Sequence, residues 1–221
     1  ASGVVEMDAS IMDGASGRAG AVTAVRDLVN PVKAARAVMD HTPHILLAGD
    51  GADRFCIEQG LDRTTGRTDW YRLPIGVELQ ETLRDELAHG TVGAVAMDRK
   101  GRLAAATSTG GLFGKRAGRV GDTPLIGCGT WADDRVAISC TGLGEYFILN
   151  SAAYDIAARM KYGAQSLADA ADHLLSDVEQ LGGDGGLIGL SAEGDLVLPF
   201  NSHGMKRAWV TAETSPEVHV F

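Results

Sequence analysis

Apolar and polar positions in the N-terminal part of the chain follow strand and helix patterns in turn. Alternating or β-branched runs bounded by turn residues such as Asp13-Gly14 predict strands. Asn30-Pro31 predicts a helix start, because asparagine caps helices and proline is tolerated at the first helical position. The pattern predicts strands at residues 4–12 and 18–25, a helix from Asn30 that ends before Thr42, a short buried strand at 44–48 and a short helix at 54–59.

Gly49-Asp50-Gly51 stands just before the second of these helices. Helix N-termini attract anions, so such a segment could cradle one. The more common role of such a segment is only to turn the chain, and we expect that role here.

From Leu61 to His89 the composition shifts. Charged residues and turn formers dominate, no period persists, and Pro74 interrupts the middle. We therefore predict a linker over about residues 61–90, which ends in a candidate helix at 77–88.

The linker leads into a predicted β-hairpin. Residues 92–97 alternate along a strand, Arg99-Lys100-Gly101 supplies a turn, and residues 103–107 return. With the loop centred near Arg99-Lys100, positions whose numbers sum to about 199 to 201 face one another. This register places Thr91 opposite Thr109, within one residue.

The rest of the chain predicts helices between strands. Residues 114–123 have no period and are expected to form a loop. Ser166 is the expected cap of the last helix. The pattern predicts strands at 125–129, 136–140, 187–191, 196–200 and 205–210, and helices at 145–162 and 166–181. Antiparallel hairpins with helices between them favour an α+β fold, a four-layer αββα sandwich of antiparallel sheets, over a parallel βαβ sheet.

Composition narrows the classes of function. With 221 residues and 45% hydrophobic content, the chain can bury a large core, in one large domain or two small ones. A net charge of −9 argues against nucleic-acid and anionic-membrane partners, which require basic patches. Cys56, Cys128 and Cys140 form no Cys-x-x-Cys pair, so neither a disulfide framework nor a zinc site is indicated. No apolar run of about 18 residues and no signal-peptide pattern is visible, and we expect a cytoplasmic protein.

Thr91 is the candidate nucleophile. A threonine hydroxyl needs a base, but His89 lies on the wrong side of the strand head and the other histidines are in unrelated segments. Cleavage before Thr91 would free an α-amino group, whose unperturbed pKa of about 8 suits it as the base. The alternative is a structural threonine in a hairpin.

Blocks in a fixed order resemble the plant-type asparaginase or isoaspartyl peptidase family, whose members are N-terminal nucleophile hydrolases that cut themselves. The resemblance reaches the start of the chain, where Asp8-Ala9-Ser10-Ile11-Met12-Asp13-Gly14 and Asn30-Pro31 match the family's α-subunit. The blocks of the second part are His89-Gly90-Thr91-Val92-Gly93-Ala94-Val95, Thr107-Ser108-Thr109-Gly110-Gly111, Gly118-Arg119-Val120-Gly121-Asp122-Thr123-Pro124, Cys140-Thr141-Gly142-Leu143-Gly144-Glu145, Gly182 to Gly186, Pro199-Phe200-Asn201, Gly204-Met205 and Arg207-Ala208-Trp209.

The resemblance implies the roles of the nucleophile and its neighbours. The precursor would be cut between Gly90 and Thr91, leaving residues 1–90 as the α-subunit portion and 91–221 as the β-subunit. Thr91 would then act as nucleophile with its own amine as base. Thr109 matches the threonine that assists the nucleophile and the self-cleavage.

The resemblance also implies a substrate site. Arg119 and Asp122 match the pair that binds the substrate's α-carboxylate and α-amino group, which suits their charges. Thr141 and Gly142 match the oxyanion hole, and Gly144 would let the loop pass close to the ligand. The alternative for Arg119 and Asp122 is a loop salt bridge.

The expected enzyme hydrolyses L-asparagine and β-aspartyl dipeptides, needs no cofactor, and forms a dimer of αβ heterodimers. Family precursors also carry upstream His-Gly-Gly-Ala-Gly and Asn-Ala-Gly segments and a structural sodium loop. We expect that several dozen such residues precede Ala1, and no metal ligand is assigned here. One alternative is a glycosylasparaginase-like hydrolase, although those usually have Asp before the nucleophile and Asn in place of Gly110 or Gly111. The other is an uncleaved, non-catalytic homologue that acts in binding or assembly.

Overall fold

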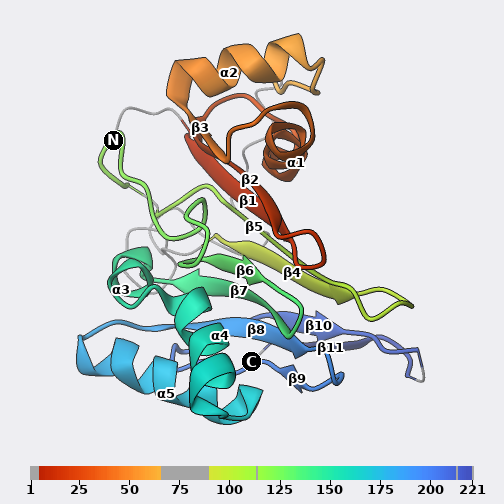
Figure 1. The fold of residues 1–221 in the computed structure, drawn as a ribbon. Coiled ribbons are helices and arrows are strands. Elements are labelled where there is room, and N and C mark those ends of the chain that lie inside the picture. The colour runs from red at the N-terminus through yellow and green to blue at the C-terminus, as the bar shows by residue number, and fades with distance from the viewer. Residues whose placement is uncertain (1–4, 66–89, 113, 213, 221) are drawn as a thin grey trace.

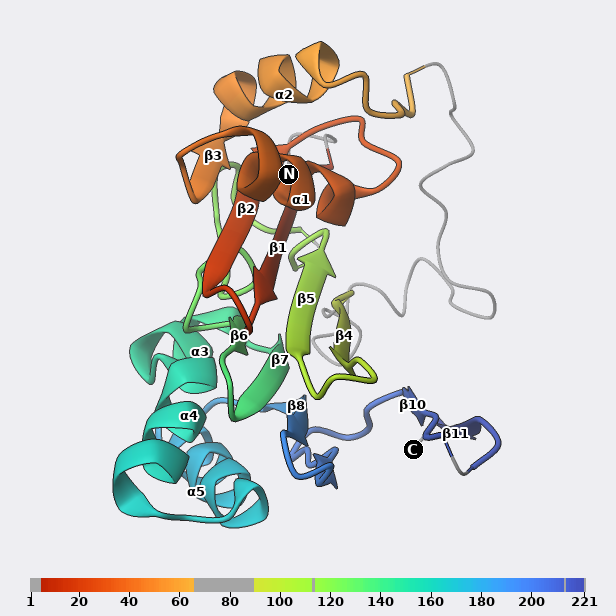
Figure 2. The ribbon, with the colours of Figure 1, turned by 45° about the vertical axis from the view of Figure 1, so that its right-hand side comes forward.

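The computed structural model describes residues 5–65, 90–112, 114–212 and 214–220. Within these residues the chain forms two large sheets that face each other, with helices on both outer sides, and a separate two-stranded sheet (Figures 1 and 2). The layers confirm the predicted α+β αββα sandwich.

The first sheet has the strand order β3-β2-β1-β5-β4. All its neighbours are antiparallel except β2 and β3, which pair in parallel, so this sheet is mixed rather than purely antiparallel. Its strands are β1 (Met7–Asp13), β2 (Arg18–Val25), β3 (Leu46–Ala48), β4 (Val92–Met97) and β5 (Leu103–Thr109).

Helix α1 (Pro31–His41) covers the outer face of this sheet. The side chain of Asn30 accepts a hydrogen bond from the Lys33 backbone N–H at 3.2 Å, which confirms the predicted cap. The helix lies very close to β2, because a Cβ atom on Gly20 would be 2.1 Å from the Ala35 carbonyl oxygen. Only glycine at this position therefore permits the observed packing.

Helix α2 (Gly49–Glu58) begins earlier than the predicted residue 54. Gly49-Asp50-Gly51 forms its first turn, and Asp50 pairs with Arg26 on the surface. The segment therefore continues directly from β3 into a helix, without a separate turn. β3 itself is an edge strand with an exposed Leu46, so the prediction of a buried strand there is wrong.

The second sheet has the order β6-β7-β8-β9 and is antiparallel throughout. Helices α4 and α5 pack on its outer face (Figure 2), and the buried residues of α5 belong to the hydrophobic core between these helices and the sheet. Ser166 accepts from the Asp169 N–H at 3.1 Å, as the predicted cap requires. The elements are β6 (Thr130–Ala132), β7 (Val136–Gly142), β8 (Gly185–Ser191), β9 (Leu196–Val197), α3 (Gly144–Leu149), α4 (Ala152–Gly163) and α5 (Leu167–Gln180).

Other elements also differ from the prediction. The single helix expected at 145–162 is two helices, α3 and α4, because Ser151 adopts a left-handed conformation with φ of 48°. The strand expected at 125–129 is a run of turns that ends where β6 begins, with Gly127 at φ of 91°. At the C-terminal end, β10 (Arg207–Trp209) pairs with β11 (Glu217–His219), which the sequence pattern did not reveal. Most of the predicted linker and its candidate helix lie outside the described residues.

Buried hydroxyl groups join the two sheets. Ser10 on β1 donates to the Thr123 carbonyl oxygen at 2.6 Å and shares a hydrogen bond with the Thr130 hydroxyl group of β6 at 2.7 Å. Thr107 on β5 shares hydrogen bonds with Thr130 and, at 2.7 Å, with Ser139 of β7. These contacts fix the relative positions of the strands whose ends form the site described next.

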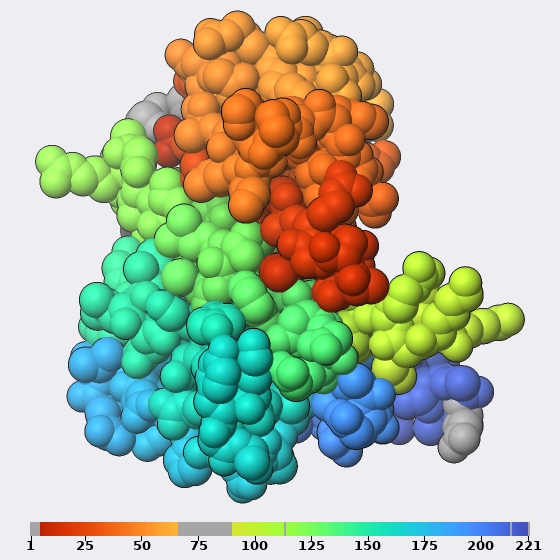
Figure 3. Space-filling model, viewed as in Figure 1, coloured from red at the N-terminus to blue at the C-terminus, as the bar shows by residue number. Residues whose placement is uncertain are grey.

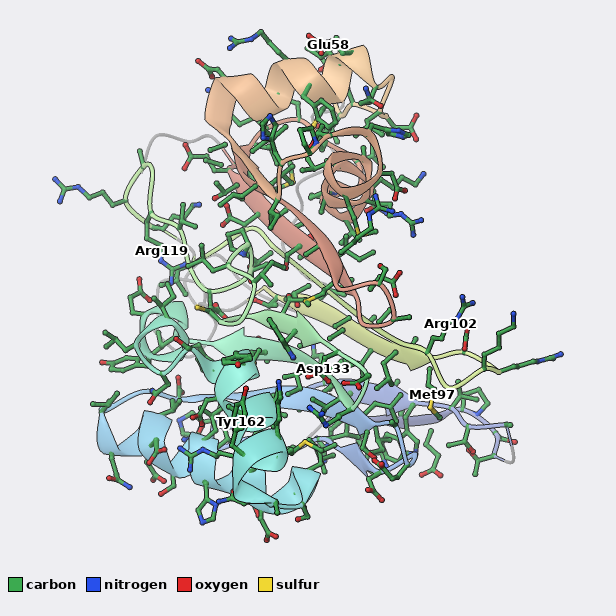
Figure 4. All side chains as sticks on the ribbon, in the orientation of Figure 1. Glu58, Met97, Arg102, Arg119, Asp133 and Tyr162 are labelled. Atoms are coloured by element: carbon green, nitrogen blue, oxygen red, sulfur yellow. The ribbon has the colours of Figure 1, made fainter. Side chains whose placement is uncertain are left out.

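The β4–β5 hairpin has the predicted register, since Val92 pairs with Ser108 and Gly93 with Thr107. Its closed end protrudes from the molecule, as the yellow-green atoms at the right of Figure 3 show. Met97 and Arg102 mark that end in Figure 4, on the side opposite Arg119.

Candidate active site

A small pocket forms where the chain enters β4 and leaves β5 and β7. The loop that follows β5 supplies the other wall. The pocket is lined by Thr91, Thr109, Gly111, Leu112, Arg119, Gly121, Asp122, Thr123 and Gly142. Five residues singled out from the sequence therefore meet in one place: Thr91, Thr109, Arg119, Asp122 and Gly142.

Two threonine hydroxyls lie together in this pocket. Thr91 Oγ1 donates to Thr109 Oγ1 at 3.2 Å, and the Gly111 backbone N–H donates to the same Thr109 oxygen at 3.0 Å. The hairpin register brings them together, because Val92 and Ser108 form the last pair at the open end of the hairpin, and Thr91 directly precedes Val92 while Thr109 directly follows Ser108. Gly90 is exposed, and a Cβ atom built on it would meet nothing within 4 Å. The peptide bond before Thr91 is therefore open to solvent next to the hydroxyl pair.

Asp122 is a buried acid in the pocket wall. The residue is 5% exposed, and its Oδ2 atom has no hydrogen-bond partner among the described residues. Burial raises the pKa of this carboxyl group to about 7, although the nearby Arg119 opposes the shift. A buried acceptor without a donor is costly, so this oxygen is suited to receive a donor from a ligand.

Gly144 stands behind that carboxylate rather than in the pocket lining. A Cβ atom at this position would lie 2.7 Å from Asp122 Oδ1 and 2.9 Å from the Asp122 backbone nitrogen. Its observed role is thus to make room for Asp122.

Arg119 forms an ion pair with a residue that the sequence analysis did not single out. Its Nε atom donates to Glu145 Oε1 at 2.8 Å and its Nη2 atom to Glu145 Oε2 at 2.7 Å. The hydrogen bond raises the pKa of Arg119 and lowers the pKa of Glu145. A loop salt bridge is therefore present, but it joins Arg119 to Glu145 and not to Asp122.

Thr141 and Gly142 end β7, where they pair with Gly186 and Gly185 of β8. Gly142 lines the pocket, whereas Thr141 is not among the lining residues. Gly142 has φ of 149°, and a Cβ atom there would be 2.4 Å from the Asp184 carbonyl oxygen. No other residue fits at Gly142 without moving the backbone of β8.

The sequence analysis missed Asp8, which is fully buried on β1 directly across the ladder from Thr109. Its Oδ1 atom accepts from Thr23 Oγ1 at 2.7 Å and from the Ala24 N–H at 2.9 Å. Asp8 and Ser10 lie in the block that resembles the family's α-subunit. Because residues two apart in a strand point to the same face of the sheet, this spacing could have predicted that both side chains lie on one face.

The described residues contain no cluster of three or more His, Cys, Asp or Glu side chains that could hold a metal ion. In the same part of the chain, no helix has the length and hydropathy needed to cross a membrane. None of the histidines that the structure describes lines the pocket.

The chain resembles known proteins over nearly its whole length. Residues 1–220 match the family model described as Asparaginase. The isoaspartyl peptidase of Salmonella typhimurium is 46% identical over 99% of this chain and 75% of that protein. The isoaspartyl peptidase of Escherichia coli is 46% identical over 98% of this chain and 72% of its own length. A probable isoaspartyl peptidase/L-asparaginase 2 of Arabidopsis thaliana is 38% identical over 99% and 77%, respectively.

Proposed function

Because the chain belongs to the asparaginase family of N-terminal nucleophile hydrolases, we propose that it hydrolyses L-asparagine to L-aspartate and ammonia and cleaves β-aspartyl dipeptides. The names of its relatives in bacteria and animals, isoaspartyl peptidase and L-asparaginase, support both activities. The observation that carries the proposal is the Thr91–Thr109 hydroxyl pair at 3.2 Å in a pocket that also contains Arg119 and Asp122.

In the proposed reaction, Thr91 Oγ1 attacks the side-chain carbonyl carbon of the aspartyl group. The free α-amino group of Thr91 takes the hydroxyl proton and passes it to the departing ammonia or amino acid. Water then attacks the resulting ester, which returns the hydroxyl group and releases aspartate. Because Thr91 supplies both nucleophile and base, we propose no cofactor for this step.

The amine that acts as base is created by self-cleavage between Gly90 and Thr91. In the proposed step Thr91 Oγ1, assisted by Thr109, attacks the Gly90 carbonyl carbon, and the Gly90–Thr91 C–N bond breaks to leave an ester and the free α-amino group of Thr91. Water then hydrolyses the ester, which restores the Thr91 hydroxyl group and leaves Gly90 with a carboxylate. The exposure of Gly90 and the adjacent hydroxyl pair support this assignment. The products are residues 1–90 and a second piece that begins with Thr91.

Recognition of the substrate is assigned to Arg119 and Asp122. A guanidinium fork suits the α-carboxylate, and the unpartnered Asp122 Oδ2 suits the α-ammonium group. The Gly142 N–H and the Thr141 hydroxyl are assigned to the developing oxyanion. For Gly142 the support is its place in the pocket lining, and for Thr141 it is the family resemblance.

We further propose a cytoplasmic dimer of processed heterodimers. The three cysteines are free, which fits a reducing compartment. The assembly rests on the family resemblance.

The proposal is tested by incubating the purified protein, recording its intact mass, and measuring aspartate release from asparagine and β-Asp-Leu. Two fragments divided at Gly90 and Thr91, together with release of aspartate, are expected. Thr91→Ala should block both events, and the matched control Thr91→Ser, which keeps the hydroxyl group, should retain both at lower rates. An uncut, inactive protein would instead fit the non-catalytic alternative, and activity on glycosylated asparagine alone would fit the glycosylasparaginase alternative.

A further inference from the structure

The Arg119 guanidinium group is bound along one edge by a carboxylate that stands outside the pocket. Its Nε and Nη2 atoms both donate to Glu145, at 2.8 and 2.7 Å. Arg119 lines the pocket and its side chain is only 16% exposed, whereas the Glu145 side chain is 52% exposed and does not line the pocket. Figure 4 shows Arg119 beside α3, the helix that carries Glu145. The ion pair therefore spans from the surface to the pocket wall.

The opposite end of the guanidinium group lies against Gly121. A Cβ atom on Gly121 would be 3.0 Å from Arg119 Nη1 and 3.3 Å from Nη2, so a side chain here would press on the fork. Among the described residues, Nη1 of Arg119 donates no hydrogen bond, and this atom is not fully buried. Nη1 and the second hydrogen of Nη2 therefore stay available to a ligand in the pocket.

The backbone of Arg119 is held separately from its side chain. Lys115 Nζ donates to the Arg119 carbonyl oxygen at 3.0 Å and lies 3.7 Å from Glu6 Oε2. Glu6 also accepts from the Gly118 N–H at 3.1 Å. With the backbone fixed by these contacts, the orientation of the guanidinium plane depends on Glu145.

We propose that Glu145 is a positioning residue for substrate recognition: it holds the Nε–Nη2 edge of Arg119 so that the Nη1–Nη2 edge meets the substrate's α-carboxylate. This inference rests on the proposed hydrolysis of aspartyl substrates. A planar guanidinium group has two donor edges, so both carboxylates can be bound at once. The competing idea is that Glu145 occupies the substrate's place and must leave. That idea predicts the opposite change in KM.

The test compares Glu145→Ala and Glu145→Gln with wild type and with Glu179→Ala, a control that removes an exposed glutamate from α5. The substrates are β-Asp-Leu and the same dipeptide with the α-carboxylate of its aspartyl residue converted to an amide. For the carboxylate substrate, Glu145→Ala should raise KM about tenfold with kcat within about twofold, and Glu145→Gln should raise KM less. For the amide substrate neither variant should change KM, so the preference for the carboxylate falls. The control should match wild type on both substrates.

Three outcomes would overturn the inference while leaving the proposed function intact. These are an unchanged KM, a lower KM in Glu145→Gln, or an equal rise in KM for both substrates, each with active wild type. Calorimetric titration with L-aspartate gives a readout that does not depend on turnover, and Glu145→Ala should weaken binding about tenfold there too. Wild-type protein that neither turns over nor binds aspartate would overturn the proposed function together with this inference.

Discussion

Thr91 and Thr109 lie side by side at the open end of one hairpin, with their hydroxyl oxygens 3.2 Å apart. Thr109 Oγ1 accepts hydrogen bonds from both the Thr91 hydroxyl and the Gly111 N–H. With two donors directed at it, this oxygen stabilises the position of the Thr91 hydroxyl and fixes its direction. The same pair can therefore influence both self-cleavage and turnover.

Replacing Thr109 by valine should slow both reactions, because valine keeps the shape and removes the acceptor. We expect about a 100-fold lower kcat, since positioned proton-transfer partners typically contribute factors of that size. Thr109→Ser, the matched control, should stay within about tenfold of wild type. Self-cleavage is followed by intact mass and turnover by aspartate release. Equal rates for the valine and serine variants would contradict the role of the hydroxyl group.

The carboxyl group of Asp122 should titrate near pH 7, because burial raises its pKa to about that value. The unfolded-state pKa is about 3.9, so folding favours the protonated form. The stability that this group contributes is fully present below about pH 4 and is lost as the pH rises through 7. Relative to Asp122→Asn, wild type should lose on the order of 4 kcal/mol between pH 4 and pH 8.

Urea unfolding of both proteins at several pH values measures this difference, and ¹³C NMR of the carboxyl carbon gives the pKa directly. Glu145→Gln should lower the pKa of Asp122, since the Glu145 charge is one of the groups that raise it. If Asp122 instead titrated near pH 4, its carboxylate would be solvated, which would contradict the burial seen in this structure.

Gly144→Ala should weaken substrate binding more than it slows chemistry. The added methyl group would lie 2.7 Å from Asp122 Oδ1 and 3.0 Å from Gly121 Cα, so the acid and its loop must move. We expect a KM increase of about tenfold and a loss of about 1–3 kcal/mol in unfolding free energy. Gly51→Ala, on α2 with open space around it, is the control and should leave KM unchanged. Steady-state kinetics and urea unfolding on both variants decide the matter.

Thr107→Val should destabilise the fold without touching the pocket. Its hydroxyl group links Thr130 and Ser139 between the sheets, and valine would leave those buried hydroxyls short of a partner. The expected cost is about 1–3 kcal/mol. Thr107→Ser keeps the bonds and should cost less, and a urea titration of both variants separates lost bonding from lost packing. A valine variant as stable as wild type would mean that the network contributes nothing.

Ser151→Gly should stabilise the protein. Ser151 is held at φ of 48°, a conformation that costs an L-residue about 1–2 kcal/mol and glycine very little. Thermal unfolding should therefore show a higher Tm for the glycine variant, and Ser151→Ala, the control, should show no such gain. A lower Tm for Ser151→Gly would show that the left-handed conformation of Ser151 does not destabilise the protein.

The helix break at Ser151 also shows why parts of the fold escape prediction from sequence. Caps and registers are local: Asn30 and Ser166 cap their helices and the 99–101 turn sets the hairpin register, so each was predictable. A left-handed serine within an apolar period carries no local signal, and the apolar run at 125–129 looks like a strand although it forms turns.

Pairings between distant side chains were the other gap. Thr91 and Thr109 were placed together by register alone, but Arg119 and Glu145 meet only because the loop that carries Arg119 and the first turn of α3 converge in three dimensions. Asp8 was missed for the same reason, since its burial follows from the β1–β5 ladder and an isolated strand would leave an acid facing water. Local chemistry can be read along the chain, whereas long-range partners require the fold.

The place of β4 at the edge of its sheet has a consequence for the two proposed fragments. Thr91 precedes the strand, so a cut there severs no rung of any ladder. The fragments would share one sheet: β1, β2 and β3 from the first, β4 and β5 from the second. Their common seam is the β1–β5 ladder, which runs from the Asp8–Thr109 pair to the Asp13–Ala104 pair. Maturation would thus divide one polypeptide into two without changing the architecture. The two fragments could separate only if the β1–β5 ladder in the middle of the sheet were broken.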